Sequence, residues 1–518
     1  MEKSRPLTTW HFWCGLVIVL WPSAECGWAQ SADQRYQLGR RLSRFEKAWQ
    51  VASPEIRAQC VSSMEKAVQS FFGLQLSQAA RLLDVAWLTA SGIPDAERAE
   101  WSRWSGLSID IEASLLDTQS QQLRWRLHPV YASFPEGDAQ PEGDTQLQGV
   151  NAPQVLEEAP LGRLCLNLIR GDRIVATESW SVPRALSGPS IDEWMIWNLP
   201  RIDEGDYRVQ ATMSTESGCD IDLIADAASF VPNLQTRMQS LNEWSTANRK
   251  GKGDTRFMTL RLLARELQQA LKGEANEADY PWNQCLLDFE QLVAPESSVR
   301  TWIEREAPRT FWLNLCDGKN NQIVRVEVPK LSGEPMPVLC AFHGAGGSEN
   351  MFFETYGAGR LIDLARQRTW LVVSPRQTMS LNGLSMNLEQ ILDGLSDIAP
   401  TVSKQAVLVG HSMGAAQAIS QASKHPERVR AVVALGGGGR PTASDSIAQI
   451  PFWIAAGSND FGRSGARALA TQLERLGCVV AYRDYPEVEH MVIVQAALDD
   501  LFAFLDEILS QAASSSAP

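Results

Sequence analysis

The most informative stretch of this 518-residue sequence is Gln405-Ala-Val-Leu-Val-Gly-His-Ser-Met-Gly414. Its first half is an apolar, β-prone run, and the alanines that follow it favour a helix. A strand, a glycine-flanked serine and a helix in this order are typical of a nucleophile elbow, a tight turn that presents the serine. Glycine at positions 410 and 414 has a steric reason, because a side chain there would clash with the neighbouring strand or helix. We therefore predict that Ser412 is a nucleophile.

A serine hydroxyl needs a base that takes its proton and a third group that orients this base. His490 follows the apolar run 479–482 and a short acidic loop, and it precedes an apolar helix over 491–509. A loop after the last predicted strand is where a general base is expected, so we predict this role for His490. We expect His411 to point away from the serine, and His425 to lie in a surface turn.

The acid is predicted from the strand that precedes the histidine-bearing one. Residues 451–456 form an apolar run typical of a strand, and Asp460 lies on the loop that follows it. We therefore predict Asp460 as the acid. Asp445 on the preceding loop, and Glu487 or Glu489 beside the histidine, remain alternatives, although loop carboxylates are usually only solvated.

Backbone N–H donors are required where a tetrahedral intermediate develops negative charge. Residues 337–347 are typical of a buried strand that opens into a His-Gly-Ala-Gly-Gly loop, whose glycines let backbone amides approach a substrate closely. We expect donors for this oxyanion hole at Met413, which follows the serine, and at Ala345, with Gly344 and Gly346 as neighbouring alternatives. A phosphate-binding loop fits poorly, because neither a Gly-Lys-Ser/Thr ending nor a helix with the needed lysine follows.

With these motifs, residues from about 300 to 512 resemble an α/β-hydrolase of the secreted serine esterase type. They are similar to polyhydroxybutyrate depolymerases and to feruloyl or acetylxylan esterases, and more distantly to the catalytic part of prolyl oligopeptidase-like enzymes. The chain order Ser412, Asp460, His490 is that of the α/β-hydrolases. The resemblance implies carboxylic ester hydrolysis through an acyl-enzyme, with no metal and no organic cofactor.

The hydrolase-like region also alternates strands and helices, which predicts a mostly parallel sheet with helices on both faces. The catalytic residues then lie at the carboxyl ends of the strands. The predicted strands cover residues 323–328, 338–342, 370–374, 406–409, 431–435, 452–456 and 479–482.

The connection after the strand at 431–435 is short, because only four glycines and about a dozen further residues precede the next strand. Many lipases carry a lid at this place. We therefore expect no large cap, and an open cleft suited to soluble esters or to the chain ends of a polymer.

Length and composition predict several domains in an acidic protein. A chain of 518 residues is too long for one core. Its net charge of −14 argues against nucleic acid or an anionic membrane as a partner. The predicted segments are a signal peptide over 1–29, a helical region over 30–98, a small β-sandwich-like domain over 99–232, a helical linker region over 233–295, the α/β-hydrolase domain over 296–512 and a disordered tail over 513–518.

The two segments before the hydrolase region are predicted from their periodicity. Strand rhythm over 99–232 resembles a sandwich of the immunoglobulin or fibronectin kind. Apolar residues recur at helical spacing over 241–271, and we expect this helix to pack against the N-terminal helices. The role of these N-terminal domains is not apparent from the sequence.

The N-terminus is typical of an export signal. Lys3 and Arg5 precede an apolar stretch over 12–21, and Gly27-Trp-Ala29 offers small residues for cleavage before Gln30. We therefore predict a secreted or periplasmic protein with no stable membrane insertion after cleavage, the alternative being an uncleaved anchor. The seven cysteines that remain lack metal-site spacing, and we expect Cys340 to be a buried thiol.

Three functions follow from the sequence. The first is a secreted serine esterase that acts on small-molecule or polymer-linked carboxylic esters. The second is a prolyl oligopeptidase-like peptidase, although the predicted strands are too few for a β-propeller. The third is a non-catalytic binding protein that keeps the hydrolase fold, but such a protein does not need Ser412, Asp460, His490 and the oxyanion loop together.

Overall fold

The structure is a computed structural model, and the predicted signal peptide over 1–29 lies outside the residues it describes. Within the described ranges, no helix is both long and apolar enough to cross a membrane. These ranges are 31–131, 162–182, 193–215, 218, 220–251, 253–273, 279–331, 333, 335–380, 383–399 and 401–515.

The chain begins with a helical layer. Leu38, Leu42, Phe45 and Trp49 recur at helical spacing and are all buried. The helical character continues beyond the expected boundary at residue 98, because a fourth helix runs on to Ser105. The helices are α2 (Ser31–Val51), α3 (Pro54–Phe72), α4 (Leu76–Ala90) and α5 (Asp95–Ser105).

A β-sheet domain follows, and its described strands form one nine-stranded sheet, not a series of propeller blades. Trp125 of β3 packs against Trp180 of β5, with ring centroids 4.6 Å apart, so the sheet folds over into two layers. β1 pairs with β8, and β2 with β9, in parallel, unlike the antiparallel sheets of the predicted immunoglobulin kind. The strands are β1 (Leu107–Ile111), β2 (Leu115–Asp117), β3 (Gln122–Pro129), β4 (Gly162–Arg170), β5 (Arg173–Val182), β6 (Met195–Asn198), β7 (Gly205–Thr215), β8 (Asp220–Ala225) and β9 (Ala227–Val231).

The helices that follow the β-sheet domain pack on the hydrolase domain. The stretch 241–271 is two helices, because α7 begins anew at Asp254, whose carboxylate accepts the Phe257 amide. Leu263 and Leu267 of α7 share a buried cluster with the hydrolase strand β10, so the predicted packing on the N-terminal helices is wrong. An apolar helix face can pack on any apolar surface, and the sequence does not indicate which surface that is. The helices are α6 (Leu234–Ala247), α7 (Thr255–Leu271), α8 (Trp282–Val293) and α9 (Val299–Glu306).

The C-terminal domain contains the predicted mostly parallel sheet, in the order β10-β11-β13-β12-β16-β17-β18-β19. β10 and β11 are antiparallel to their neighbours, and the other pairs are parallel. The strands are β10 (Arg309–Cys316), β11 (Asn321–Val328), β12 (Met336–Phe342), β13 (Leu371–Pro375), β16 (Val402–His411), β17 (Val429–Leu435), β18 (Phe452–Gly457) and β19 (Val480–Tyr485), with a small hairpin of β14 (Thr378–Ser380) and β15 (Gly383–Ser385).

Helices cover both faces of this sheet, as predicted. Leu339 and Ala341 of β12 pack in one buried cluster with α10 and α14, and Val338 and Cys340 pack in a second cluster with α11, α12 and α13. Cys340 is fully buried, as predicted. The helices are α10 (Arg360–Gln367), α11 (Leu388–Ile398), α12 (Met413–Lys424), α13 (Arg463–Arg475) and α14 (Ile493–Ser515), the last of which extends into the segment expected to be a disordered tail.

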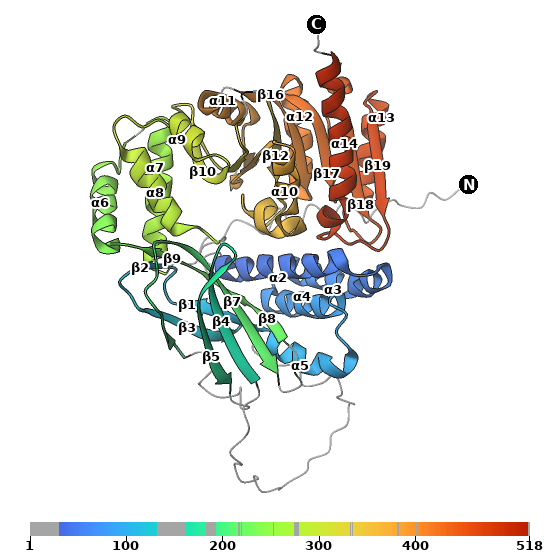
Figure 1. The fold of residues 1–518 in the computed structure, drawn as a ribbon. Helices are drawn as coiled ribbons and strands as arrows, with labels where there is room; N and C mark the ends of the chain where they lie inside the picture. The colour runs from blue at the N-terminus through green and yellow to red at the C-terminus, as the bar shows by residue number, and fades with distance from the viewer. Residues whose placement is uncertain are drawn as a thin grey trace.

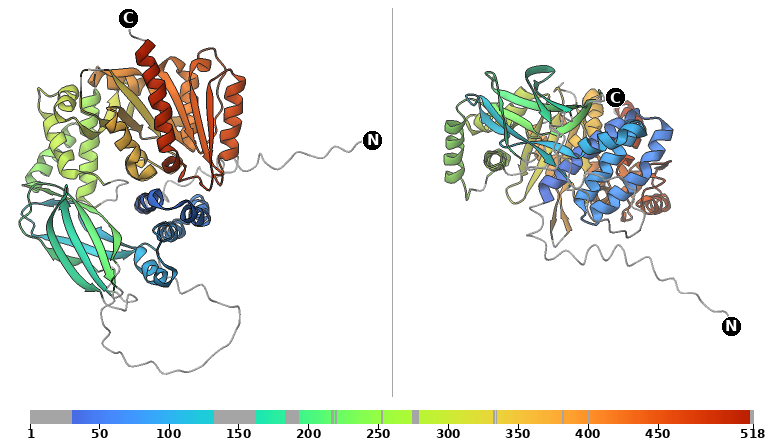
Figure 2. Two further views of the ribbon diagram at one scale, coloured as in Figure 1. Left: turned by 45° about the vertical axis from the view of Figure 1, so that its right-hand side comes forward. Right: turned by 90° about the horizontal axis from the view of Figure 1, so that it is seen from below.

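The N-terminal helices lie between the β-sheet domain and the hydrolase domain (Figures 1 and 2). α2 contacts two short helical turns that follow β12, η1 (Met351–Thr355) and η2 (Tyr356–Gly359). The contact is close, because a Cβ on Gly39 would lie 2.9 Å from the Thr355 hydroxyl. The helical layer therefore covers the edge of the sheet from which the β12 and β16 loops emerge.

Candidate active site

The predicted elbow is a sharp turn between β16 and α12. Ser412 has φ +56° and ψ −116°, a strained conformation of the kind that clusters at functional sites. Its amide donates to the Leu435 carbonyl of the next strand, at 2.8 Å. A Cβ on Gly410 would lie 2.1 Å from the Gly414 carbonyl oxygen, and one on Gly414 would lie 2.0 Å from that of Phe342. Both glycines are therefore required by close backbone packing.

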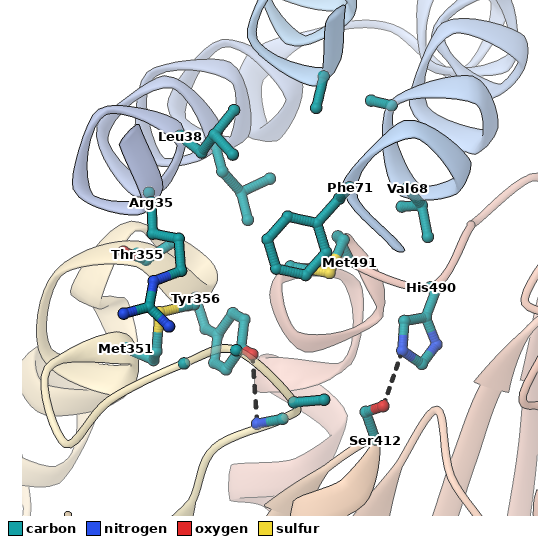
Figure 3. Close-up of a pocket in the computed structure, with 18 of the residues that line it drawn as sticks. Arg35, Leu38, Val68, Phe71, Met351, Thr355, Tyr356, Ser412, His490 and Met491 are labelled. Carbon is teal, nitrogen blue, oxygen red and sulfur yellow. Dashed lines mark hydrogen bonds between the residues drawn. The ribbon is translucent and has the colours of Figure 1, made fainter. Parts of the chain in front are cut away.

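The structure brings Ser412, His490 and Asp460 into one hydrogen-bonded row (Figure 3). His490 Nε2 lies 3.0 Å from Ser412 Oγ, and His490 Nδ1 lies 2.7 Å from Asp460 Oδ1. The serine is at the end of β16, the aspartate on the loop after β18, and the histidine on the loop after β19. With Nδ1–H donating to the carboxylate, Nε2 is left to accept the serine proton.

The three alternative acids are placed differently. The carboxylate of Glu489 accepts the amides of Met491 and Val492, both at 2.9 Å, just before α14 begins. Burial raises the pKa of Glu489 to about 7. Glu487 is exposed and has φ +56°, and Asp445 is exposed on the connection between β17 and β18. Of the candidate acids, the structure places Asp460 against the imidazole.

His411 supports the base in a way that the sequence did not indicate. As expected, it does not contact the serine hydroxyl, but its Nε2 lies 2.8 Å from the backbone carbonyl of His490, to which it donates. Burial, with a smaller contribution from His490, lowers the pKa of His411 to about 3, so the ring stays neutral. Its hydrogen bond fixes the backbone that carries the base, over a separation of 79 residues.

The backbone amides of Gly344 and Ala345 on the oxyanion loop and of Met413 at the start of α12 differ in their hydrogen bonding. The Gly344 amide faces the Tyr356 hydroxyl at 3.4 Å, so the structure favours Ala345 over Gly344 as a donor. Among the described residues, none accepts a hydrogen bond from the backbone amide of Ala345 or Met413. The turn is closed by the Gly347 amide, which donates to the Gly344 carbonyl at 3.3 Å. Two free donors beside a serine match the requirement for stabilising an oxyanion.

A pocket above Ser412 is roofed by the N-terminal helices, which overturns the expected open, cap-free cleft. Its cavity volume is about 80 Å³, and Ser412 and His490 are among the residues that line it. The connection between β17 and β18 is indeed short, but the cover comes from α2, α3 and α4 instead. From these helices the pocket is lined by Arg35, Leu38, Gly39, Leu42, Met64, Ala67, Val68, Phe71, Phe72, Ala79 and Leu83.

A candidate cation site lies away from Ser412. Among the described residues, the group whose ligand atoms are close enough to share an ion is Glu389, His425 and Glu427, within 4.8 Å of one another. This group lies at the opposite end of α12 from Ser412. Exposed acidic groups often show such spacing without an ion, and no residue of the group reaches the serine.

Part of this chain is similar to known proteins. Residues 338–514 match the alpha/beta hydrolase family. An S-formylglutathione hydrolase from Agrobacterium tumefaciens is 18% identical, with 39% of this chain and 94% of that chain covered and a TM-score of 0.32. The carboxylesterase EstE1, cloned from a metagenomic library, is 15% identical, with 42% and 96% covered and a TM-score of 0.31. Est1E from Butyrivibrio proteoclasticus is 13% identical, with 39% and 99% covered and a TM-score of 0.29.

Proposed function

We propose that the α/β-hydrolase domain of this chain is a serine esterase that cleaves carboxylic esters. The observation that carries the proposal is the hydrogen-bonded row of Ser412, His490 and Asp460, with Nε2 3.0 Å from the serine oxygen. Two unengaged amides beside the serine add the stabilisation that acyl transfer needs. A binding protein has no use for a strained serine that is aligned with a buried base.

The reaction proceeds in two steps. His490 Nε2 takes the Ser412 proton as the serine oxygen attacks the ester carbonyl, and the amides of Met413 and Ala345 hold the oxyanion. The C–O bond to the alcohol then breaks, and the alcohol oxygen receives the proton from His490. Water, deprotonated by the same nitrogen, attacks the acyl-enzyme; the bond between the acyl carbon and Ser412 Oγ breaks, His490 returns the proton to this oxygen, and the acid is released. Asp460 fixes the imidazole tautomer throughout.

The test is hydrolysis of p-nitrophenyl butyrate by the full chain and its variants. Ser412→Ala should lower kcat by about 10⁶-fold and Asp460→Asn by about 10⁴-fold, because the first loses the nucleophile and the second the imidazole tautomer. Ser420→Ala, at a half-buried position further along the same helix, serves as the matched control and should keep full activity. Activity that survives in Ser412→Ala would contradict the proposal.

We also propose that the chain is exported and that residues 1–29 are removed. The charged start, the apolar stretch and the small residues before Gln30 support this proposal. Expression in a bacterium with a periplasm, followed by N-terminal sequencing of that fraction, should give a chain that begins at Gln30. A protein that stays in the cytoplasm with Met1 intact would overturn the export proposal and leave the esterase proposal untouched.

A further inference from the structure

We propose that the N-terminal helical layer forms the acyl-binding wall of the active site, and that the natural substrates are esters with an apolar acyl chain. The inference rests on the proposed esterase function and deepens it. The pocket above Ser412 is small, with a cavity volume of about 80 Å³. Its walls come from two distant parts of the chain.

The walls between the helices and the oxyanion loop are apolar. Leu38 of α2 and Phe71 of α3 face Met351 and Tyr356 across the pocket (Figure 3), and Leu42 of α2 also lines it. Leu38 and Leu42 are nearly buried even without a ligand, at 7% and 4% exposure. Such a lining offers few partners for a sugar or a peptide backbone, whose unpaired polar groups would be costly to bury. It suits a chain of methylene groups.

The direction of the pocket assigns it to the acyl side of the ester. His490 must protonate the departing alcohol, so the alcohol lies on the histidine side of Ser412. From Ser412 the pocket runs over the oxyanion loop toward Leu38, while His490 and Met491 line its opposite end (Figure 3). The part over the oxyanion loop therefore lies away from the histidine. Arg35 lies at its far end, beyond Met351, and marks the limit of the apolar stretch. The geometry thus predicts that the acyl chain is limited in length.

The wall on the acyl side is fixed to the hydrolase domain. The Glu46 carboxylate of α2 accepts the Ala358 amide of η2 at 3.0 Å. The Phe71 ring lies against the oxyanion loop, where a Cβ on Gly346 would be 2.8 Å from its edge. These contacts hold the wall in place before substrate arrives, so little ordering is needed on binding.

The alcohol side opens at an apolar rim. Phe72 of α3 and Phe461 of the acid loop pack edge to face with ring centroids 5.7 Å apart, and Phe461 lies 4.0 Å from the His490 ring. Both phenylalanines are exposed, at 49% and 62%. An exposed aromatic pair beside the base is a suitable entrance for an apolar ester.

The test measures kcat/KM of the full chain for p-nitrophenyl acetate, butyrate, hexanoate and octanoate. We expect a rise of about three- to fourfold for each added methylene until the pocket is filled, since each buried methylene contributes a factor of this size. Leu38→Trp should lower the octanoate-to-acetate ratio at least about tenfold, because the indole fills the pocket. Lys47→Trp, at an exposed position on the same helix, should leave this ratio unchanged. Leu38→Ala should shift the optimum to longer chains.

The outcomes separate this inference from the function on which it rests. Ester hydrolysis with a flat chain-length profile, or a ratio unchanged in Leu38→Trp, would overturn the acyl wall and leave the esterase intact. If Leu38→Trp does not fold, the Leu38→Ala variant decides. An optimal acyl chain length identical to that of the unaltered chain would then overturn the acyl wall. A folded protein that hydrolyses none of the four esters and whose Ser412 does not react with a small fluorophosphonate would overturn the proposed function itself.

Discussion

Gly436 lies against the acid–base pair. It has φ +59°, and a Cβ there would lie 2.7 Å from Asp460 Oδ2 and 3.3 Å from His490 Nδ1. Gly436→Ala should therefore displace the carboxylate from the imidazole. We expect kcat to fall by about 100-fold, the typical cost of a misplacement near 1 Å. Steady-state kinetics with p-nitrophenyl butyrate measures this loss.

Gly477 supplies the matched control for this prediction. It also has positive φ, +80°, but a Cβ there meets nothing within 4 Å. Gly477→Ala therefore introduces the same kind of backbone strain without the contact, and should cost stability but not kcat. Equal kcat values in the two variants would mean that Gly436 does not shape the acid–base pair.

Because His411 is buried, we predict that the free energy of unfolding depends on pH. Its pKa is about 3 when folded and near 6.5 when unfolded, so the unfolded chain binds more protons between these values. Stability is therefore lost as pH falls from 6.5 toward 3, by up to about 1.4 kcal/mol per pH unit. His411→Gln, whose amide can still donate to the His490 carbonyl, should reduce this slope in urea unfolding between about pH 7 and pH 5.

His425 provides the comparison for that measurement. It is partly exposed at the end of α12, beside Glu389. His425→Gln should leave the slope of the unaltered protein nearly intact. If both substitutions change the slope equally, burial of His411 is not the source of the pH dependence.

The residues of the row were predictable because each has a local signal. Ser412 lies in its own motif, and Asp460 and His490 each follow an apolar strand-forming run. The role of His411 was not predictable, because its contact is with a carbonyl 79 residues away. Likewise, the choice between Ala345 and Gly344 depends on the Tyr356 hydroxyl, which no spacing rule indicates.

The helices α2 and α3 show what the periodicity of a sequence predicts and what it does not predict. Their apolar spacing predicted helices with one buried face, which the structure confirms. Periodicity does not say which surface covers that face, so the sequence missed the helical roof over Ser412. The short connection after β17 led to the expectation of an open cleft, because a lid was sought at the usual place of insertion and not at the N-terminus.

The contact between α2 and η2 leads to a further prediction, which concerns Glu46 and the pH dependence of stability. Burial, and to a lesser extent the Glu489 carboxylate, raises the pKa of Glu46 well above its ordinary value of 4.5. A raised folded pKa stabilises the fold below the unfolded pKa, and this contribution is lost as pH rises. Glu46→Gln cannot ionise and still accepts the Ala358 amide. We expect it to gain about 1 kcal/mol or more over the unaltered chain between pH 4.5 and pH 8.

Urea unfolding at both pH values measures this gain. Glu474→Gln, an exposed change on α13, is the control and should show no comparable gain. A Glu46→Gln chain whose relative stability is the same at both pH values would show that this carboxyl does not carry an uncompensated buried charge.

At the scale of the whole molecule, the N-terminal helices join the domains into one body. A single buried cluster contains residues from α2–α4, from the β-sheet domain and from the α14 face of the hydrolase sheet. Composition and periodicity change along the chain, and the division into predicted segments rests on these changes. The sequence could not predict their assembly, which depends on contacts between segments hundreds of residues apart, such as Glu46 with Ala358.

The proposal that Ser412 is an activated nucleophile is tested most directly by labelling with a fluorophosphonate probe. The full chain and its Ser412→Ala variant are labelled side by side. Such a probe reacts with an activated serine whatever the natural ester is. We predict a covalent adduct on Ser412, located by mass spectrometry of its peptide, and no adduct in the variant. A folded protein that remains unlabelled, or an adduct on another serine, would contradict the assignment of Ser412, His490 and Asp460 as an active catalytic triad.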